Sequence, residues 1–229
     1  MALRALKRVP GLKSAYYLSI VIRQMVTDQW RDADSFNDIF LATPDPWQSA
    51  SSTSEKERFR ITLSLLASCA VQRFATAAEL GCAEGIFTER LTSHCARLLA
   101  LDYSPVALER ARQRLGNDES VSFRQWDMRH QALEGDFDLI VAMGILTSLY
   151  RPGDVRDICD MIVGSLKPHG YLLFSDVRQS RVFEGAWWGR FVLRGGEQIR
   201  RLLSHDHRLE LISDANTDSH VFALYRRVR

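Results

Sequence analysis

The stretch AELGCAEGIFTERL, residues 78–91, decides the fold of this chain. Its apolar start carries the acid Glu79, a turn bracketed by Gly81 and Gly85 follows, and the pattern then becomes helix-like. A glycine turn between a strand and a helix usually brings a ligand against bare backbone. The ligand that this turn holds is the first question that the sequence raises.

Strand-like and helix-like segments alternate from residue 75 to the end of the chain. Such alternation predicts an α/β fold, with a mostly parallel sheet that helices cover on both faces. The last two strands are joined by a short polar loop, which predicts an antiparallel C-terminal hairpin at one edge. The expected strands are 75–80, 97–102, 121–127, 136–143, 170–177, 209–213 and 221–228, and the expected helices are 85–95, 104–115, 154–166 and 197–204.

The first 48 residues are interpreted as an N-terminal helical extension, with amphipathic helices at 14–26 and 34–42. A Ser/Thr-rich stretch follows, in which Ser54 is expected to lead into the next helix. We therefore expect two units, an extension or lid over 1–48 and a Rossmann-like domain over 49–229.

The composition is that of an ordinary globular protein, with 46% hydrophobic residues, 25% charged residues and a net charge of +2. Residues 1–31 nevertheless hold six Lys and Arg against one Asp. A membrane-surface role is one interpretation of this segment, and a solvated amphipathic helix is the more usual one. No stretch approaches the ~20 apolar residues of a membrane span. A cytoplasmic protein is expected, because no signal-peptide cleavage pattern follows the short apolar run at 15–22.

Two kinds of partner are not expected. The four cysteines lie far apart, without a CxxC pair or histidines at zinc-ligand spacing, so no metal site is predicted. The core domain lacks a basic face interleaved with aromatic residues, so no nucleic acid is predicted either.

The glycine turn departs from both common phosphate-binding motifs. A dinucleotide fingerprint would place glycines where this chain has Ala83 and Ile86, and Glu84 adds a carboxylate that disfavours a phosphate. No G-K-[ST] follows, which excludes a Walker loop.

S-adenosylmethionine fits this turn because it needs a close backbone approach and carries no phosphate. Asp102 ends the second expected strand, where its carboxylate can accept both ribose hydroxyls. Asp127 follows the third strand and can accept from the adenine amino group, and Trp126 can cover an adenine face. Each residue alone is more often structural. Their joint occurrence after successive strands favours this cofactor.

Four stretches together resemble the successive motifs of class I S-adenosylmethionine-dependent methyltransferases. They are AELGCAEGIFTERL (78–91), RLLALDYSPVALERAR (97–112), GDFDLIVAMGIL (135–146) and LKPHGYLLF (166–174). The lead-in DPWQSASSTSEKERFRITLSLL (45–66) is similar to that of the nodulation S-type subgroup, which N-methylates an amino sugar on a chitooligosaccharide.

The resemblance implies a seven-stranded Rossmann-like sheet and S-adenosyl-L-methionine as the cofactor. Trp47 and Arg58 of the lead-in would then lie over the cofactor as a lid. The expected cofactor-binding residues are Glu79, Gly81, Cys82, Gly85, Asp102, Tyr103, Asp127, Met128, Met143, Trp47 and Arg58.

The acceptor is expected to be a small molecule, because the N/D-P-P-Y/F-type clamp of base and amide methyltransferases is missing from MGILTSLY (143–150). Methyl transfer needs alignment and exclusion of water, so a strong catalytic signature is not required.

The candidate catalytic residues are Tyr150, His205 and His207, since a histidine pKa near 6.5 suits proton removal. The two histidines sit between a helix and a strand, where a solvated loop is the more usual explanation. Asp176 and the adjacent Trp187 and Trp188 are the candidate acceptor-binding residues, with plain packing of the tryptophans as the alternative.

The leading interpretation is a methyltransferase acting on an N or O of an amino sugar or glycosylated natural product. Two alternatives are left open. An NAD-dependent oxidoreductase is disfavoured by Ala83 and Ile86, and a non-catalytic methyltransferase-fold partner subunit is disfavoured by the joint presence of Asp102 and Asp127.

Overall fold

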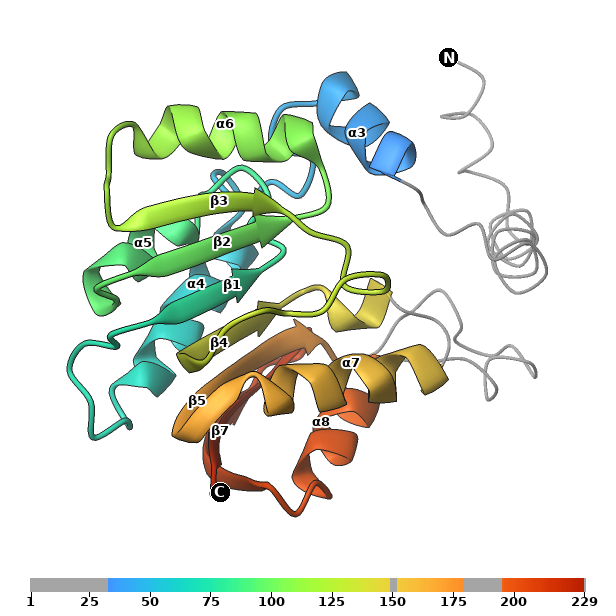
Figure 1. The fold of residues 1–229 in the computed structure, drawn as a ribbon. Coiled ribbons are helices and arrows are strands. Elements are labelled where there is room, and N and C mark those ends of the chain that lie inside the picture. The colour runs from blue at the N-terminus through green and yellow to red at the C-terminus, as the bar shows by residue number, and fades with distance from the viewer. Residues whose placement is uncertain (1–32, 149–151, 179–194, 229) are drawn as a thin grey trace, which may run out of the picture.

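A seven-stranded sheet forms the centre of the protein (Figure 1). The computed structural model describes residues 33–148, 152–178 and 195–228 of the 229-residue chain. The strand order is β3-β2-β1-β4-β5-β7-β6, in which β7 runs in the direction opposite to the other six strands. The expected mostly parallel sheet with an antiparallel C-terminal hairpin is confirmed. The strands are β1 (Ala77–Leu80), β2 (Leu98–Asp102), β3 (Val121–Gln125), β4 (Phe137–Met143), β5 (Leu166–Val177), β6 (Leu209–Asn216) and β7 (His220–Arg227).

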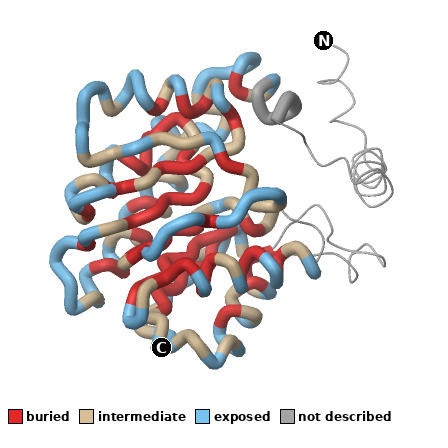
Figure 2. The backbone as a smooth tube through the Cα atoms, in the orientation of Figure 1, coloured by how far each residue is buried: buried red, intermediate tan, exposed pale blue. Residues whose placement is uncertain are grey.

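Helices cover both faces of the sheet. Successive side chains of a strand point to opposite faces, so the apolar core has one main cluster on each face. On β4, Ile140 and Ala142 join the apolar cluster under α7 (Pro152–Gly164) and α8 (Gly196–Ser204). Leu139 and Val141 join the cluster under α4 (Thr53–Leu66) and α5 (Thr88–Leu91). Figure 2 shows the buried backbone concentrated along the central strands. This two-sided burial explains why the central strands β1 and β4 are nearly continuous apolar runs.

The remaining described helices are α6 (Pro105–Leu115), which covers β2 and β3, and α3 (Ala33–Ala42), which lies against α6 (Figure 1). α6 begins as expected, with Pro105 as its first residue and the Ser104 hydroxyl accepting from the Ala107 N–H at 3.1 Å. α3 matches the helix expected at 34–42. The helix expected at 14–26 lies outside the described residues.

The start of α4 corrects one expectation. Ser52, not Ser54, is the N-cap residue, and its hydroxyl accepts from the Glu55 N–H at 3.5 Å. The helix therefore begins at Thr53, and its buried face is set by Phe59, Thr62, Leu65 and Leu66.

The helix expected at 85–95 is also shorter than its pattern predicts. α5 ends at Leu91 and a 3-10 turn over Thr92–His94 follows. The hydroxyls of Thr92 and Ser93 donate to the carbonyls of Glu89 and Arg90, which competes with continued helix formation.

β5 begins earlier than expected. Lys167 and Pro168, which fall between the helix expected at 154–166 and the strand expected at 170–177, lie inside the strand. β4 and β5 pair at Phe137–Leu166 and resume at Leu139–Tyr171, so the residues between bulge out of the ladder. A proline is tolerated there because a bulge needs no ladder N–H.

None of the helices in the described residues is both long enough and apolar enough to cross a membrane.

Candidate active site

A cavity of about 480 Å³ opens at the carboxyl ends of the parallel strands. Six strands that are neighbours in the sheet, β3, β2, β1, β4, β5 and β7, each supply a lining residue at this edge. β7 supplies its first residue, since it runs in the opposite direction. Strands lie ~4.8 Å apart, so the six residues follow a path of about 24 Å across the sheet. In the same order they are Asp127, Asp102, Glu79, Met143, Asp176 and His220.

The glycine turn after β1 brings backbone to the cavity. Gly81 has φ +75°, and a Cβ at this position would overlap the Cγ2 of Ile145. Gly85 has φ +77°, and a Cβ there would lie 2.9 Å from the Leu115 Cδ1 of α6. Gly85 is absent from the cavity lining, in contrast to its expected place among the cofactor contacts. Its lack of a side chain instead lets α6 pack closely on the turn.

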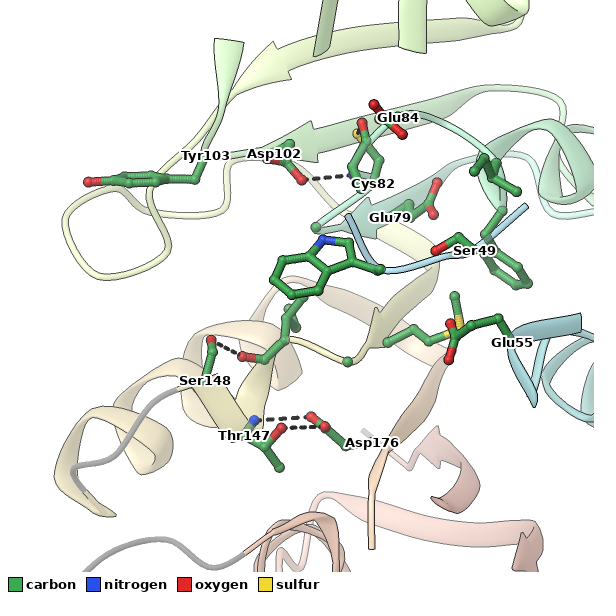
Figure 3. Close-up of a pocket in the computed structure, with 18 of the residues that line it drawn as sticks. Ser49, Glu55, Glu79, Cys82, Glu84, Asp102, Tyr103, Thr147, Ser148 and Asp176 are labelled. Carbon is green, nitrogen blue, oxygen red and sulfur yellow. Dashed lines mark hydrogen bonds between the residues drawn. The ribbon is translucent and has the colours of Figure 1, made fainter. Parts of the chain in front are cut away.

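Asp102 links the turn to the end of β2 (Figure 3). Its Oδ2 accepts from the Ala83 N–H at 2.8 Å, and its Oδ1 accepts from the Ser104 N–H at 2.9 Å. Burial raises the pKa of this carboxyl above its usual value, and the backbone hydrogen bonds oppose the shift. Each carboxylate oxygen has a second lone pair, so both can still accept from a ligand in the cavity.

Glu79 is a buried acid without a full set of partners. Its side chain is 3% exposed, and its Oε2 has no hydrogen-bond partner within the described part of the chain. Burial raises the pKa of this carboxyl to about 7, and the nearby Asp102 charge adds to the shift. An unpaired buried carboxylate at a cavity wall is costly unless a cation or a hydrogen-bond donor binds there. The site therefore suits a ligand with a positive group at this point.

Asp127 and Trp126 form the β3 end of the cavity. The Asp127 Oδ2 lies 3.3 Å from the Nη2 of Arg129, and its Oδ1 accepts from the Arg129 N–H at 3.0 Å. Trp126 is 4% exposed, and its indole Nε1 donates to the Ala132 carbonyl at 3.2 Å. The indole therefore supplies a fixed apolar wall beside a partly paired acid.

Asp176 and Thr147 meet at the other end of the cavity (Figure 3). The Thr147 N–H donates to the Asp176 Oδ2 at 3.0 Å, and the Thr147 hydroxyl donates to Oδ1. Oδ1 also accepts from the Val177 N–H at 2.8 Å, and burial raises the pKa of the carboxyl. Most of the hydrogen-bonding capacity of Asp176 thus holds the 3-10 turn Leu146–Ser148 after β4.

Arg58 reaches this end of the cavity from α4. Its Nη2 lies 2.5 Å from the Oε2 of Glu55, and its side chain is 13% exposed. Burial, with a smaller contribution from the Arg58 charge, lowers the pKa of His220 to about 4. His220 is therefore uncharged at neutral pH, beside a guanidinium that carries a positive charge.

The structure brings most of the expected cofactor residues together. Ten of the eleven line this one cavity and Gly85 does not, so their contact with a cofactor is geometrically consistent and stays a prediction. Those ten are Glu79, Gly81, Cys82, Asp102, Tyr103, Asp127, Met128, Met143, Trp47 and Arg58.

The structure places His205 and His207, two of the candidate catalytic residues, away from the cavity. They precede β6, whose first residue Leu209 pairs with Arg227 at the end of β7, at the edge of the sheet opposite the cavity. Neither lines the cavity, and the His205 Nδ1 lies 2.6 Å from the Arg201 carbonyl at the C-terminus of α8. Tyr150, Trp187 and Trp188 lie outside the described residues.

Sequence reasoning missed His220, Thr147 and Glu55 as cavity residues. The one feature of the sequence that could have indicated His220 is its position at the start of the last strand. Over the described residues, no group of three His, Cys, Asp or Glu could hold a metal ion.

Comparison with known proteins identifies relatives along most of the chain. The family model "Nodulation protein S (NodS)" matches residues 33–216. The nodulation protein S of Rhizobium tropici is 32% identical over 190 residues, which are 81% of this chain and 77% of that protein. The nodulation protein S of Sinorhizobium fredii is 34% identical over 164 residues, covering 72% and 73% of the two chains.

Solved structures agree with these relatives. The crystal structure of the N-methyltransferase NodS from Bradyrhizobium japonicum WM9, in complex with S-adenosyl-L-homocysteine, matches with a TM-score of 0.74 and 28% identity. The match covers 86% of this chain and 100% of that one. The chain therefore belongs to the nodulation protein S family and is an S-adenosylmethionine-dependent methyltransferase.

Proposed function

We propose that this methyltransferase transfers the methyl group to the amine nitrogen of a small-molecule acceptor that contains an amino sugar. Family membership supports nitrogen as the acceptor atom, because the solved NodS relative is an N-methyltransferase. The observation that carries the proposal is one continuous cavity, which has an acidic half at β1 to β3 and a second half at β4, β5 and β7. One half suits the cofactor and the other leaves room for an acceptor.

Three acids would hold the cofactor in the first half. We assign Asp102 to the ribose hydroxyls, because its oxygens keep free lone pairs, and Glu79 to the ammonium of the amino-acid tail, because its Oε2 lacks a partner. Asp127 and the fixed indole of Trp126 would receive the adenine. When bound, S-adenosylmethionine supplies an electrophilic methyl group on a sulfonium.

We further propose that the N-terminal extension over residues 1–48 acts as a lid, followed by the methyltransferase domain over 49–229. Support comes from Glu84, whose Oε2 accepts from the Asp45 N–H at 2.9 Å while its Oε1 pairs with Arg110 of α6 at 2.6 Å. The contacts hold the lead-in against the glycine turn, and Trp47 beside them lines the cavity. A docked lead-in would exclude water from the reacting atoms.

The proposed acceptor half contains Thr147, Asp176 and His220. Arg58, which the resemblance assigns to the cofactor, lines the same cavity and its charge acts on His220. Methyl transfer requires that the amine present its lone pair in line with the bond that breaks, so positioning is the main task of these residues. The hydrogen-bonded pair of Thr147 and Asp176 keeps the loop after β4 in one conformation.

The cofactor assignment is tested by isothermal titration with S-adenosylhomocysteine. We expect Asp102→Ala to weaken binding about 100-fold, which corresponds to roughly 2.7 kcal/mol for two charge-assisted hydrogen bonds. Glu109→Ala is the matched control, because this acid lies on the exposed face of α6 with its side chain 62% exposed. Equal affinities of the Asp102 variant and the wild type would contradict the assignment.

The acceptor is tested by incubating the enzyme and S-adenosylmethionine with short glucosamine oligomers that carry one free amine. The same oligomers with every amine acetylated are the control. Mass spectrometry should find one added methyl group on the first set alone. Methylation of the fully acetylated oligomers would identify a hydroxyl as the acceptor and would overturn the proposal.

A further inference from the structure

His220 occupies a distinct place in the acceptor half of the cavity. It is the first residue of β7, it pairs with Val177 across the β5–β7 ladder, and it is 8% exposed. Asp176 pairs with the next residue, Val221. Along the row of lining residues across the sheet, His220 is thus at the end farthest from Asp102 and Asp127.

Hydrogen bonds fix this residue on one side only. Its N–H donates to the Thr217 hydroxyl at 3.0 Å, and its Nδ1 lies 2.9 Å from the Ser219 hydroxyl oxygen. Its Nε2 makes no hydrogen bond to any described residue. The ring is therefore oriented through Nδ1, and Nε2 is the ring nitrogen whose hydrogen-bonding capacity is left for a ligand.

Burial keeps the imidazole ring of His220 neutral, and a neighbouring positive charge adds to this effect. Burial is the main cause of its low pKa of about 4, and Arg58 on α4 contributes. On the neighbouring strand, the Asp176 carboxyl already accepts three hydrogen bonds, and Glu55 is paired with Arg58. A group with this pKa takes up a proton from an alkylammonium only poorly.

We propose that His220 binds and orients the reacting amine of the acceptor, with Nε2 accepting a hydrogen bond from an amine N–H. The inference rests on the proposed N-methyl transfer. In the required tautomer the Nδ1–H donates to the Ser219 hydroxyl and the Nε2 lone pair faces the acceptor. An N–H held in this way leaves the nitrogen lone pair free to point along the line of attack.

The role is positioning of a bound substrate rather than proton removal. The amine nitrogen forms its bond to the methyl carbon as the carbon–sulfur bond breaks, and the electron pair of the broken bond stays on sulfur. The methylated ammonium carries the positive charge and releases its proton to water. His220 stays neutral through these changes.

Two substitutions separate this role from others. His220→Gln keeps a neutral hydrogen-bond acceptor near the position of Nε2, and His220→Leu removes it. We expect the kcat/KM of His220→Gln to stay within about tenfold of the wild type. That of His220→Leu should fall about 100-fold, because the substrate loses one hydrogen bond and the orientation that this bond gives. S-adenosylhomocysteine affinity should stay within about twofold in both, which also reports that the variants fold.

The pH dependence distinguishes orientation from general-base catalysis. The fall of kcat/KM at low pH should follow the same curve in the wild type and in His220→Gln, because it reports the protonation of the acceptor amine. A fall that moves or disappears in His220→Gln would identify a titrating base and would overturn the proposal. Equal activity of His220→Leu and the wild type would also overturn it. His207→Leu is the matched control, since His207 is exposed and lies outside the cavity.

A measurement without turnover tests His220 even if no amine is methylated. Nitrogen-15 NMR of the free protein at pH 7 should find the neutral Nδ1–H tautomer of His220. The Nε2–H tautomer or a cationic ring would refute the inference. Absence of turnover by the wild type with every amine would instead count against the proposed function.

Discussion

Gly81 and Ala83 lie two residues apart in one turn, and both have left-handed backbone, with φ +75° and +48°. Only one of them carries a side chain. The difference follows from their surroundings, since a Cβ at Gly81 would overlap Ile145 in the loop after β4. The position at which a dinucleotide fingerprint has its second glycine is thus the one that tolerates a Cβ, which agrees with a ligand that brings no pyrophosphate.

Gly81→Ala should destabilise the protein more than Gly116→Ala, a matched control. Gly116 has φ +59° and ψ −129°, and a Cβ added there would meet no atom within 4 Å, so its substitution costs only backbone strain of about 1–3 kcal/mol. Gly81→Ala adds an overlap in a packed site, for about 1–3 kcal/mol more. Urea unfolding of both variants measures the difference, and equal losses would show that Ile145 moves aside without cost.

The three acids of the proposed cofactor half could be predicted from the sequence because each lies at or just after the carboxyl end of a parallel strand. His220 could not be found in this way. The rule that ligands meet the carboxyl ends of strands applies to parallel strands, and β7 enters the sheet from the cavity edge. The histidines that sequence reasoning selected, His205 and His207, lie at the start of a strand that runs in the parallel direction, so they fall at the wrong edge.

At the scale of elements, Glu84 connects three segments of the chain. Its carboxylate joins the Asp45 N–H of the lead-in to Arg110 of α6, and its own carbonyl accepts from the Arg114 Nε at 2.9 Å. The residue is 7% exposed. From the sequence, the acid in this turn indicated only that a phosphate is disfavoured. The structure shows that Glu84 also connects the lead-in to α6.

Glu84→Gln should speed the release of S-adenosylhomocysteine by about tenfold, because the charged links from the turn to the lead-in and α6 become weaker. Hydrogen exchange at the Asp45 amide should accelerate in parallel. Glu57→Gln is the control, since it removes an exposed ion pair with Arg60 on α4. Stopped-flow measures the rate at which S-adenosylhomocysteine is released. If both variants release it at the wild-type rate, there is no lid at this position.

Element types were more predictable than element ends. Strands buried on both faces carry a strong apolar signal, so all of them were found. The ends of α4 and α5 depend on which hydroxyl meets which backbone group, as at Ser52, Thr92 and Ser93. The Pro168 bulge depends on the register with β4, which a single sequence does not contain.

At the scale of the whole molecule, two buried groups of the cavity oppose each other in their effect on stability. The pKa of Glu79 is raised to about 7, so its contribution to stability is complete below its usual value of 4.5 and is lost as the pH rises through 7. The pKa of His220 is lowered to about 4, so its contribution is complete above 6.5 and is lost as the pH falls through 4. Between these limits their effects run in opposite directions.

Single variants should therefore reveal opposite pH dependences. Relative to the wild type, the free energy of unfolding of Glu79→Gln should increase as the pH rises from 4.5 to 7. That of His220→Gln should increase as the pH falls from 6.5 to 4. Each relative change is on the order of 3 kcal/mol. Urea unfolding across this range measures both, and parallel curves for a variant and the wild type would refute the shift at that residue.

The order of lining residues across the sheet has a consequence for how such enzymes diverge. The half of the cavity that we assign to the cofactor lies on β1, β2 and β3, and the half that we assign to the acceptor lies on β4, β5 and β7. Under this assignment, mutations on β4, β5 and β7 can change the acceptor while they leave Asp102 and Glu79 untouched. A lineage can exchange one methylated metabolite for another by drifting at the β7 side while selection keeps the donor side constant.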